Sequence, residues 1–346
     1  MSRPVVALLM AGGTGTRLYP ASRSHRPKQF LSFDGGDSLL AQTADRVGFA
    51  DEVYVATRER YADAVREHVP EAGVLVEPEG KDTGPALVYA THRIREQVGD
   101  AVVLALPSDH VVSGAFARTA RRAARVADET EGLVTIGVEP TRPATGYGYV
   151  EPGEAFDGYA RVARFREKPD RETAASLVEA GCYWNAGMFA WTPDALLREA
   201  RASPLAPLVD ALDDGDPAGG FDAVDPVSVD YAVMERTRDA YVVPAGFEWD
   251  DLGAWDAIER VLDADEDGNA VLGDALAVDA SGNVVAGDKH VSVVGVDDLV
   301  VAAYDDRVLV VPKADAQRVR EVVARLKEQG RFCSASGRRR WESPSR

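Results

Sequence analysis

The residues best suited to chemistry near the start of the chain are three glycines and two cations. Gly12, Gly13 and Gly15 follow a short apolar run, and Arg17 and Lys28 come after them. Glycine lets backbone N–H groups approach a ligand closely, and consecutive amides in such a turn form a nest for an anion. A guanidinium fork and an ammonium group beside that nest would add positive charge. The pattern therefore predicts a polyphosphate site, although a tight turn without a ligand explains the glycines alone equally well.

One aspartate occupies a position that suits a divalent metal ion. Asp109 comes directly after the apolar run 102–106, within the sequence Pro-Ser-Asp-His. A carboxylate at the end of a buried strand has a fixed backbone, and its oxygens are ligands that hard cations accept. The residues alone support a second interpretation equally well, in which Asp109 caps the helix that includes 116–127.

Five residues in the middle of the chain could contact a sugar phosphate. Gly146 and Gly148 keep side chains away from a glycine–tyrosine loop, so a sugar ring could lie against its amides, although a plain hairpin is the alternative. Glu167 could accept hydrogen bonds from hydroxyls while Lys168 faces a phosphate, or the pair could be a solvated surface couple. Asn185 interrupts an apolar run and could bind hydroxyls, or it could serve the backbone alone.

The elements that must position these residues alternate between strands and helices. This alternation predicts an α/β fold with a doubly wound, mainly parallel (Rossmann-like) sheet. In such sheets ligands bind beyond the carboxyl ends of the strands, where the loops after the first, third and fourth strands fall. The predicted strands cover 5–10, 52–57, 74–76, 102–106 and 133–138, and the predicted helices cover 39–49, 61–69, a segment opening at 81–86 that runs to about 97, and 116–127.

The second half of the chain changes character after residues 263–269. Before them we expect a helix at 194–200, an exposed loop at 211–226 and a helix that Ser228 caps. After them, short valine-rich runs separated by Gly, Asp and Asn predict a small β domain over 270–312, closed by a helix at 314–327. The expected regions are a sheet domain at 1–264, a β domain with its closing helix at 265–333, and a disordered tail at 334–346.

The composition is that of an ordinary globular protein. The chain has 346 residues, of which 45% are hydrophobic, and no apolar run reaches the roughly 18 residues that span a bilayer. The first strand begins too early to leave room for a signal peptide, so we expect a cytoplasmic protein. Cys182 and Cys333 fit no metal or redox spacing, and free thiols are the preferred interpretation.

The net charge of −18 argues against nucleic acid as a partner, because phosphate backbones require a basic surface. Lysine is rare, since only six occur in the chain. An acidic, lysine-poor surface is consistent with adaptation to high salt, where self-repulsion is screened, and a coding bias toward arginine is a competing cause. A fold and an activity that persist fully in low salt would contradict the high-salt hypothesis.

Six motifs in order resemble those of the sugar-nucleotide pyrophosphorylases. The first is the glycine turn with Arg17, Leu18 and Pro20, followed by Pro-Lys-Gln at 27–29, and this ending is most similar to the mannose-1-phosphate guanylyltransferase branch. The others lie along residues 4–330. They are Pro-Ser-Asp-His at 107–110, the glycine–tyrosine loop at 143–150, Phe-x-Glu-Lys-Pro at 165–169, Asn-Ala-Gly-Met-Phe at 185–189 and Trp-x-Asp-Leu-Gly-x-Trp at 249–255. A segment at 228–235 also resembles that branch.

This resemblance implies that mannose 1-phosphate and GTP give GDP-mannose and pyrophosphate, with Mg²⁺ as the cofactor. It implies metal ligation by Asp109 and Asp251, a left-handed β-helix-like fold for the β domain, and the following roles. Arg17, Lys28 and Lys168 would be catalytic; Ala11, Gly12, Gly13, Gly15, Thr83, Gly84 and Pro107 would bind the nucleotide; Gly148, Glu167, Lys168 and Asn185 would bind the sugar phosphate. The chain departs from the family at Asp82, where relatives commonly have Asn, and at Asp250, where they often have Ser.

Two alternatives stay open at this stage. The enzyme could act on another hexose 1-phosphate with UTP or dTTP, because one hydroxyl is a small contact. The chain could instead be a non-catalytic sensor of sugar nucleotides or a regulatory subunit, although the presence of Arg17, Lys28 and both metal aspartates argues against this. Membrane partners are not expected, the β domain could serve as the surface of a homodimer, and no isomerase domain is expected after it.

Overall fold

A computed structural model describes residues 3–33 and 36–332, and these form two compact units. The first unit contains the chain up to Gly12 and Leu40–Trp249, and the second contains Gly13–Leu39 and the chain from Asp250 onward. The predicted limits at 1–264 and 265–333 do not coincide with these units, because 13–39 and 250–264 group with the β domain. The tail predicted at 334–346 lies outside the described residues.

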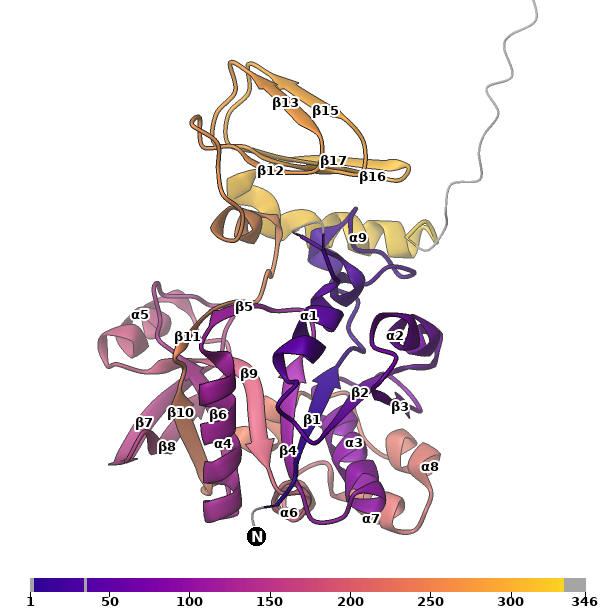
Figure 1. Cartoon of the computed structure of the whole chain (residues 1–346), viewed down its shortest axis with the longest axis vertical. Helices are drawn as coiled ribbons and strands as arrows, with labels where there is room; N and C mark the ends of the chain where they lie inside the picture. The colour runs from indigo at the N-terminus through magenta and orange to yellow at the C-terminus, as the bar shows by residue number, and fades with distance from the viewer. Residues whose placement is uncertain (1–2, 34–35, 333–346) are drawn as a thin grey trace, which may run out of the picture. The chain divides into compact units, whose positions relative to one another are not determined.

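The first unit is built on a nine-stranded sheet with the order β3-β2-β1-β4-β9-β6-β10-β8-β7 (Figure 1). Strands β3, β2, β1 and β4 are parallel, as are β6 and β10, whereas β9 runs antiparallel between β4 and β6. The strands are β1 (Val5–Met10), β2 (Glu52–Arg58), β3 (Gly73–Glu77), β4 (Val102–Pro107), β6 (Leu133–Val138), β7 (Tyr149–Phe156), β8 (Tyr159–Arg166), β9 (Tyr183–Trp191) and β10 (Ala240–Pro244).

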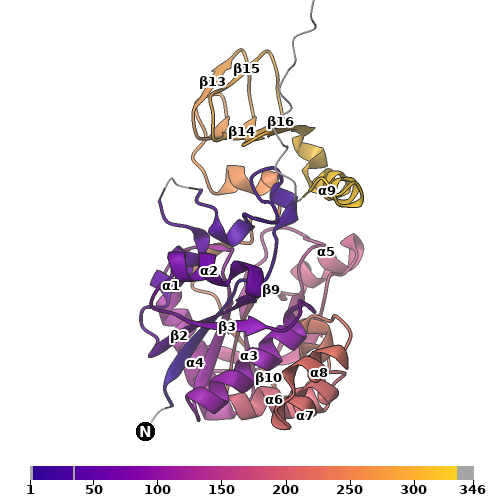
Figure 2. The ribbon, with the colours of Figure 1, turned by 90° about the vertical axis from the view of Figure 1, so that its right-hand side faces the viewer.

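Helices cover this sheet, as the continuous apolar strands require. Every residue of β6, five of the six in β4 and the four central residues of β1 are buried, irrespective of the direction in which their side chains point. Helix α4 packs on β4, β6, β9 and β10, whereas α3 packs on β2 and β3 and on α6 and α7 (Figure 2). The helices are α1 (Leu39–Arg46), α2 (Ala62–His68), α3 (Thr83–Gln97), α4 (Phe116–Thr130), α5 (Arg171–Glu179), α6 (Pro193–Arg201), α7 (Ala206–Asp213) and α8 (Pro217–Asp222). The predicted doubly wound, mainly parallel sheet is confirmed.

The exposed loop predicted at 211–226 is wrong, because this region contributes to α7 and forms α8. Leu212 and Phe221 are buried in the core that these helices share with α3 and α6. Asp216 accepts a hydrogen bond from the Gly219 N–H at 3.0 Å and thereby caps α8, whose first residue is Pro217. Asp, Gly and Pro are typical of loops, but here Asp216 and Pro217 begin α8 and two glycines lie within it.

The second unit contains stacked, mostly parallel short strands. Strands β12, β14 and β16 pair in parallel, as do β13 and β15, and β17 closes the larger sheet antiparallel to β16. They are β12 (Ala270–Leu272), β13 (Ala275–Val278), β14 (Val284–Gly287), β15 (Val291–Val294), β16 (Leu299–Tyr304) and β17 (Arg307–Pro312), and α9 (Val319–Glu328) follows. This is the β-helix-like arrangement that we predicted, with its closing helix.

Buried asparagines join successive turns of this β-helix-like domain. The Asn283 Nδ2 group donates to Asn269 Oδ1 at 3.0 Å, and Asn283 Oδ1 accepts from the Leu299 N–H at the same distance. Asn269 Nδ2 in turn donates to the Asp265 carboxylate at 3.1 Å. Because buried amides must be hydrogen-bonded, this ladder fixes the register of the turns.

Two expectations drawn from composition concern thiols and membranes. Cys182 is a buried free thiol, and burial raises its pKa, whereas Cys333 lies outside the described residues. Within residues 3–33 and 36–332, no helix has both the length and the apolar character that crossing a membrane requires.

Candidate functional site

The predicted phosphate turn is held in place within the second unit by the residues that follow it. Gly15 has a φ of +55°, in the left-handed region, and a Cβ atom there would collide with the Lys28 side chain. The Gln29 side chain donates to the Gly13 carbonyl at 3.1 Å, and the Ser22 hydroxyl donates to the Gly15 carbonyl at 2.5 Å. The turn therefore folds back on the short helix Lys28–Phe30, and only glycine fits at position 15.

The two predicted cations of this turn differ in their surroundings. Arg17 is exposed, and it makes no hydrogen bond or ion pair within the described part of the chain. Lys28 is only 4% exposed, and its ammonium group donates to the Asp251 carbonyl at 2.5 Å. The fold thus brings Lys28 to the predicted metal ligand although 223 positions separate them.

The neighbouring aspartates Asp250 and Asp251 are distinguished by their partners. The Asp250 carboxylate accepts from the Leu252 N–H at 2.8 Å and pairs with Arg260 at 2.7 Å. The Asp251 carboxylate accepts from the Gly253 N–H at 3.2 Å. Arg260 thus engages Asp250. Metal ligation by Asp251, which the motif spacing favours, stays a prediction.

In the first unit, a hydrogen bond joins the ends of β1 and β4, next to the candidate nucleotide-binding residues Ala11 and Pro107. The Ser108 hydroxyl donates to the Met10 carbonyl at 2.7 Å, and Met10 pairs with Pro107 across the sheet. Ala11 uses its N–H and its carbonyl in bonds to Ala56 and Thr57, at 2.8 and 3.0 Å. Ala11 and Pro107 are therefore fixed at the carboxyl edge of the sheet, where α/β folds bind ligands.

Asp109 lies between β4 and β5 (Val111–Gly114), with 34% of its side chain exposed. The capping interpretation is wrong, because Ala115 is the N-cap residue of α4. The neighbouring His110 accepts a hydrogen bond through Nδ1 from the Trp249 indole at 3.0 Å. Asp109 belongs to the first unit and Asp251 to the second.

Aromatic rings connect this loop to the predicted sugar loop. The Trp249 ring lies 5.4 Å from the His110 ring and 5.2 Å from the Tyr147 ring, between centroids. Tyr147 in turn contacts Trp184 at 5.0 Å, edge to face. Sequence reasoning assigned no role to these rings, because their contacts join residues up to 139 positions apart.

The four predicted sugar-phosphate residues converge within the first unit. The Asn185 N–H donates to the Gly148 carbonyl at 2.8 Å, and a Cβ atom at Gly148 would collide with the Glu167 carboxylate. The Lys168 ammonium pairs with that carboxylate at 2.5 Å. Glu167 is 6% exposed at its side chain and Lys168 is 56% exposed, so the carboxylate is held inside while the ammonium reaches outward.

Asp230 is a functional candidate that the sequence did not reveal. The Asn185 Oδ1 atom accepts from the Thr135 hydroxyl and the Gly187 N–H, at 2.9 and 3.1 Å, and its Nδ2 group donates to Asp230 Oδ1 at 2.8 Å. The Asn185 side chain thus holds Asp230 in place, and its contact with a sugar stays a prediction. The position of Asp230 within the segment 228–235, which resembles the guanylyltransferase branch, was the available signal in the sequence. The sequence pattern predicts only the start of a helix there.

The charges around Asp230 shift two pKa values upward. Burial, and after it the Glu167 carboxylate, raise the pKa of Asp230 to about 7, against the opposing effects of Lys168 and Asn185. Burial opposes the charge of Lys168, but the hydrogen bond and attraction of Glu167 outweigh it and raise the Lys168 pKa, with Asp230 and Tyr231 contributing. With a pKa of about 7, the Asp230 carboxyl titrates near neutral pH, whereas the raised pKa of Lys168 keeps its ammonium group charged.

We expect the Asp230→Asn variant to be more stable than the wild type above about pH 7 and equally stable below about pH 4. Because the pKa of Asp230 is raised on folding, from 3.8 to about 7, wild-type stability falls as pH rises through that window. The difference in unfolding free energy should be on the order of 4 kcal/mol above the window. Denaturant unfolding at low and high pH measures it, and a difference independent of pH would contradict the assignment.

Thr83 and Gly84 support the same segment from the start of α3. Asp82 caps this helix by accepting from the Thr83 N–H at 2.7 Å. The Thr83 hydroxyl accepts from the Val229 N–H, and the Gly84 N–H donates to the Val227 carbonyl, both at 3.0 Å. These contacts fix the residues leading to Asp230, and contact with a base stays a prediction.

Asp109 and Asp251, which belong to different units, stay the predicted metal ligands. Among the described residues, no three His, Cys, Asp or Glu side chains gather into a group that could hold a metal. Magnesium commonly binds through one or two carboxylates and completes its shell with water and substrate phosphates. Two aspartates from the Pro-Ser-Asp-His and Trp-x-Asp motifs therefore fit Mg²⁺ by their chemistry.

Comparison with known proteins extends over nearly the whole chain. Residues 6–268 match the family described as Nucleotidyl transferase, and residues 273–326 match the MannoseP isomerase/GMP-like beta-helix domain. The xanthan biosynthesis protein XanB of Xanthomonas campestris is 38% identical, over 94% of this chain and 74% of the relative. The mannose-1-phosphate guanylyltransferase of Salmonella montevideo is 36% identical, over 94% of this chain and 75% of the relative.

A solved structure shows the same arrangement of elements. The crystal structure described as mannose-1-phosphate geranyltransferase from Thermus thermophilus is similar with a TM-score of 0.88 and 36% identity. The similarity covers 94% of this chain and 99% of that protein, so it includes both the sheet and the β-helix-like domain.

Proposed function

We propose that this chain, which belongs to the nucleotidyl transferase family and is a nucleotidyltransferase, transfers a guanylyl group from GTP to mannose 1-phosphate. The products would be GDP-mannose and pyrophosphate. The observation that carries the proposal is the convergence of Gly148, Glu167, Lys168 and Asn185, which come from three separate motifs. A carboxylate beside an outward ammonium, next to a glycine backbone, suits hydroxyls and a phosphate on one ligand.

The reaction we propose is an in-line displacement. A phosphate oxygen of mannose 1-phosphate attacks the α-phosphorus of GTP, and the bond to the β-phosphate oxygen breaks as pyrophosphate leaves. Such a transfer needs no covalent enzyme intermediate, so the protein contributes positioning and charge neutralisation. Amides of the turn at Gly12, Gly13 and Gly15 would bind the triphosphate, with Arg17 and Lys28 opposing the charge on the leaving group.

The nucleotide base and the metal complete the proposed site. We assign guanine to the first loop, at Ala11, and to the segment that contains Thr83 and Gly84, as the resemblance implies. Pro107 would also bind the nucleotide. Asp109 and Asp251 would hold Mg²⁺, which when bound neutralises phosphate charge. The buried ammonium of Lys28, bound to the Asp251 carbonyl, supports a role for this loop in binding anions.

A grid of substrates tests the proposed specificity. Pyrophosphate release would be measured with Mg²⁺, at low and high KCl, for four nucleoside triphosphates against mannose, glucose and N-acetylglucosamine 1-phosphates. We expect the highest rate with GTP and mannose 1-phosphate, and higher rates in high salt if the acidic surface reflects adaptation to salt. A maximum with UTP or dTTP, or with another sugar, would overturn the specificity.

Replacing Lys168 by methionine should mainly weaken the binding of the sugar phosphate. The variant removes the charge that faces outward beside Glu167, and one lost charge-assisted contact raises the KM for mannose 1-phosphate by about tenfold to a hundredfold. The KM for GTP should stay within about twofold of the wild-type value. Arg171→Met, which removes an exposed cation at the start of α5, is the matched control. An unchanged KM for mannose 1-phosphate would remove Lys168 from that role.

A further inference from the structure

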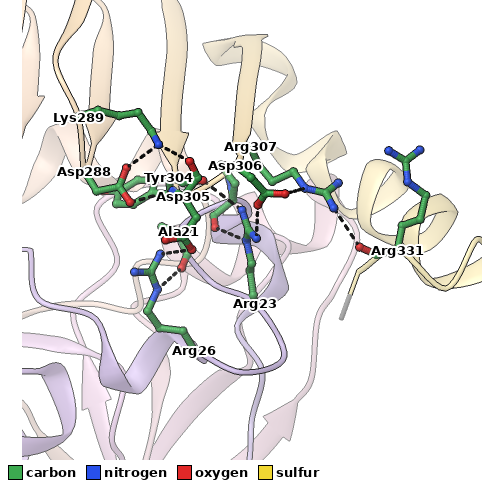
Figure 3. A network of polar contacts seen from close by, with 11 residues as sticks. Ala21, Arg23, Arg26, Asp288, Lys289, Tyr304, Asp305, Asp306, Arg307 and Arg331 are labelled. Carbon is green, nitrogen blue, oxygen red and sulfur yellow. Dashed lines mark hydrogen bonds and ion pairs between the residues drawn. The ribbon is translucent and has the colours of Figure 1, made fainter. Parts of the chain in front are cut away.

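Arg23 lies between the two predicted catalytic cations of the phosphate segment, and it is buried in the second unit. Its side chain is 3% exposed, and its guanidinium pairs with Asp306 at 2.7 Å (Figure 3). The same group donates to the Tyr304 carbonyl at 3.1 Å and to the Pro20 carbonyl at 3.3 Å. One side chain therefore connects the phosphate segment 13–39 to the turn between β16 and β17.

Arg26 makes a second connection at the same turn. Its guanidinium lies 3.6 Å from the Asp305 carboxylate and 5.6 Å from the centre of the Tyr304 ring. The backbones of Arg23 and Arg26 exchange hydrogen bonds at 2.9 and 3.1 Å, which closes the loop that they flank. The two arginines thus contact the turn as one folded unit.

The turn itself is braced by the neighbouring coil. The Asp305 N–H donates to the Asp288 carboxylate at 2.8 Å, and the Lys289 ammonium donates to the Asp305 carbonyl (Figure 3). Arg307 pairs with Asp306 at 3.1 Å, which holds that carboxylate from the opposite side. The attachment point of Arg23 is therefore fixed on a β-sheet framework.

We propose that Arg23 and Asp306 are positioning residues, through which the β-helix-like domain holds Arg17 and Lys28 in place for the triphosphate. This inference rests on the proposed function. Arg23 stands six positions after Arg17 and five before Lys28, so the ion pair restrains both. Neither residue of the pair is assigned to substrate, and their effect passes through the segment. Small displacements of charged groups at a reacting centre lower rates by up to about a hundredfold.

The test compares Asp306→Asn with Glu259→Gln. The second variant is the matched control, since it breaks the 2.6 Å pair of Glu259 with Lys313 in the same unit without touching segment 13–39. We expect Asp306→Asn to lower kcat/KM for GTP by about tenfold or more while the KM for mannose 1-phosphate stays unchanged. Asp306→Glu, which keeps the charge, should recover most of the loss. Glu259→Gln should match the wild type in both constants.

Hydrogen exchange of the peptide 16–31 gives a readout that needs no substrate. Faster exchange in Asp306→Asn, but not in Glu259→Gln, together with the kinetic loss, would support positioning. Equal kinetics in the two variants, or unchanged exchange of this peptide, would overturn it. If the wild type transfers no guanylyl group, the proposed function fails by itself, and unchanged exchange would show separately that the ion pair does not hold the segment.

Discussion

Asparagine in place of Asp109 is expected to lower turnover by about a hundredfold to a thousandfold while the fold stays intact. The substitution keeps the shape of the side chain and removes the charge that a hard cation prefers. A third of this side chain is exposed, and Ala115 caps the following helix, so α4 does not depend on the aspartate. Turnover at saturating GTP and mannose 1-phosphate, measured over a range of Mg²⁺ concentrations, is the direct measurement.

Asp63→Asn is the control for this experiment. Asp63 is an exposed carboxylate on α2 in the same unit and pairs with Arg66 at the helix surface. Its removal should leave turnover within about twofold of the wild type, because exposed ion pairs contribute little. Near-normal turnover of Asp109→Asn, with the same Mg²⁺ dependence as the wild type, would remove Asp109 from the metal site.

Methionine in place of Lys28 is expected to lower kcat/KM for GTP by about a hundredfold to a thousandfold. Methionine fills a similar volume but removes a buried charge that the Asp251 carbonyl now holds at 2.5 Å. A cation enclosed by protein interacts with phosphate more strongly than one in water, so its loss should be felt most as charge develops on the leaving group. The measurement is initial velocity over a range of GTP concentrations at fixed mannose 1-phosphate.

A second lysine in the same unit separates this effect from loss of charge in general. Lys327→Met removes an exposed ammonium from α9, and kcat/KM for GTP should change less than about twofold. Lys28→Met should keep the circular dichroism spectrum of the wild type. If it does so and still uses GTP with wild-type kcat/KM, Lys28 has no part in binding the triphosphate.

Local patterns in the sequence determined much of the first unit. The continuous apolar runs at 5–10, 102–106 and 133–138 could only be satisfied in a sheet covered on both faces, and they form β1, β4 and β6. Asp82 caps α3 through a contact between residues close in the chain, of the kind that local sequence can indicate. The same locality explains why α8 was missed, since its Asp, Gly and Pro residues fit a loop or a short helix until Phe221 is buried.

The identities of the predicted site residues also came from short motifs, whereas their partners did not. Gly15 and Lys28 can be chosen from spacing, but the collision that excludes a side chain at Gly15 exists only once the segment folds back. The ammonium of Lys28 meets a carbonyl 223 positions away, and the sequence offers no local signal for that contact. Long-range contacts of this kind depend on how whole elements pack.

Tertiary structure alone revealed Asp230, Trp249 and Arg23 as residues to study. Asp230 acquires its raised pKa from burial and from the carboxylate of Glu167, which lies far from it in the sequence. Arg23 becomes a positioning candidate only because β16 and β17 place Asp306 beside it. The sequence by itself therefore determined the buried strands and the chemical groups of the motifs, which depend on neighbours in the chain. The fold decided which of those groups are buried, charged and held together, because burial and electrostatic coupling act through space.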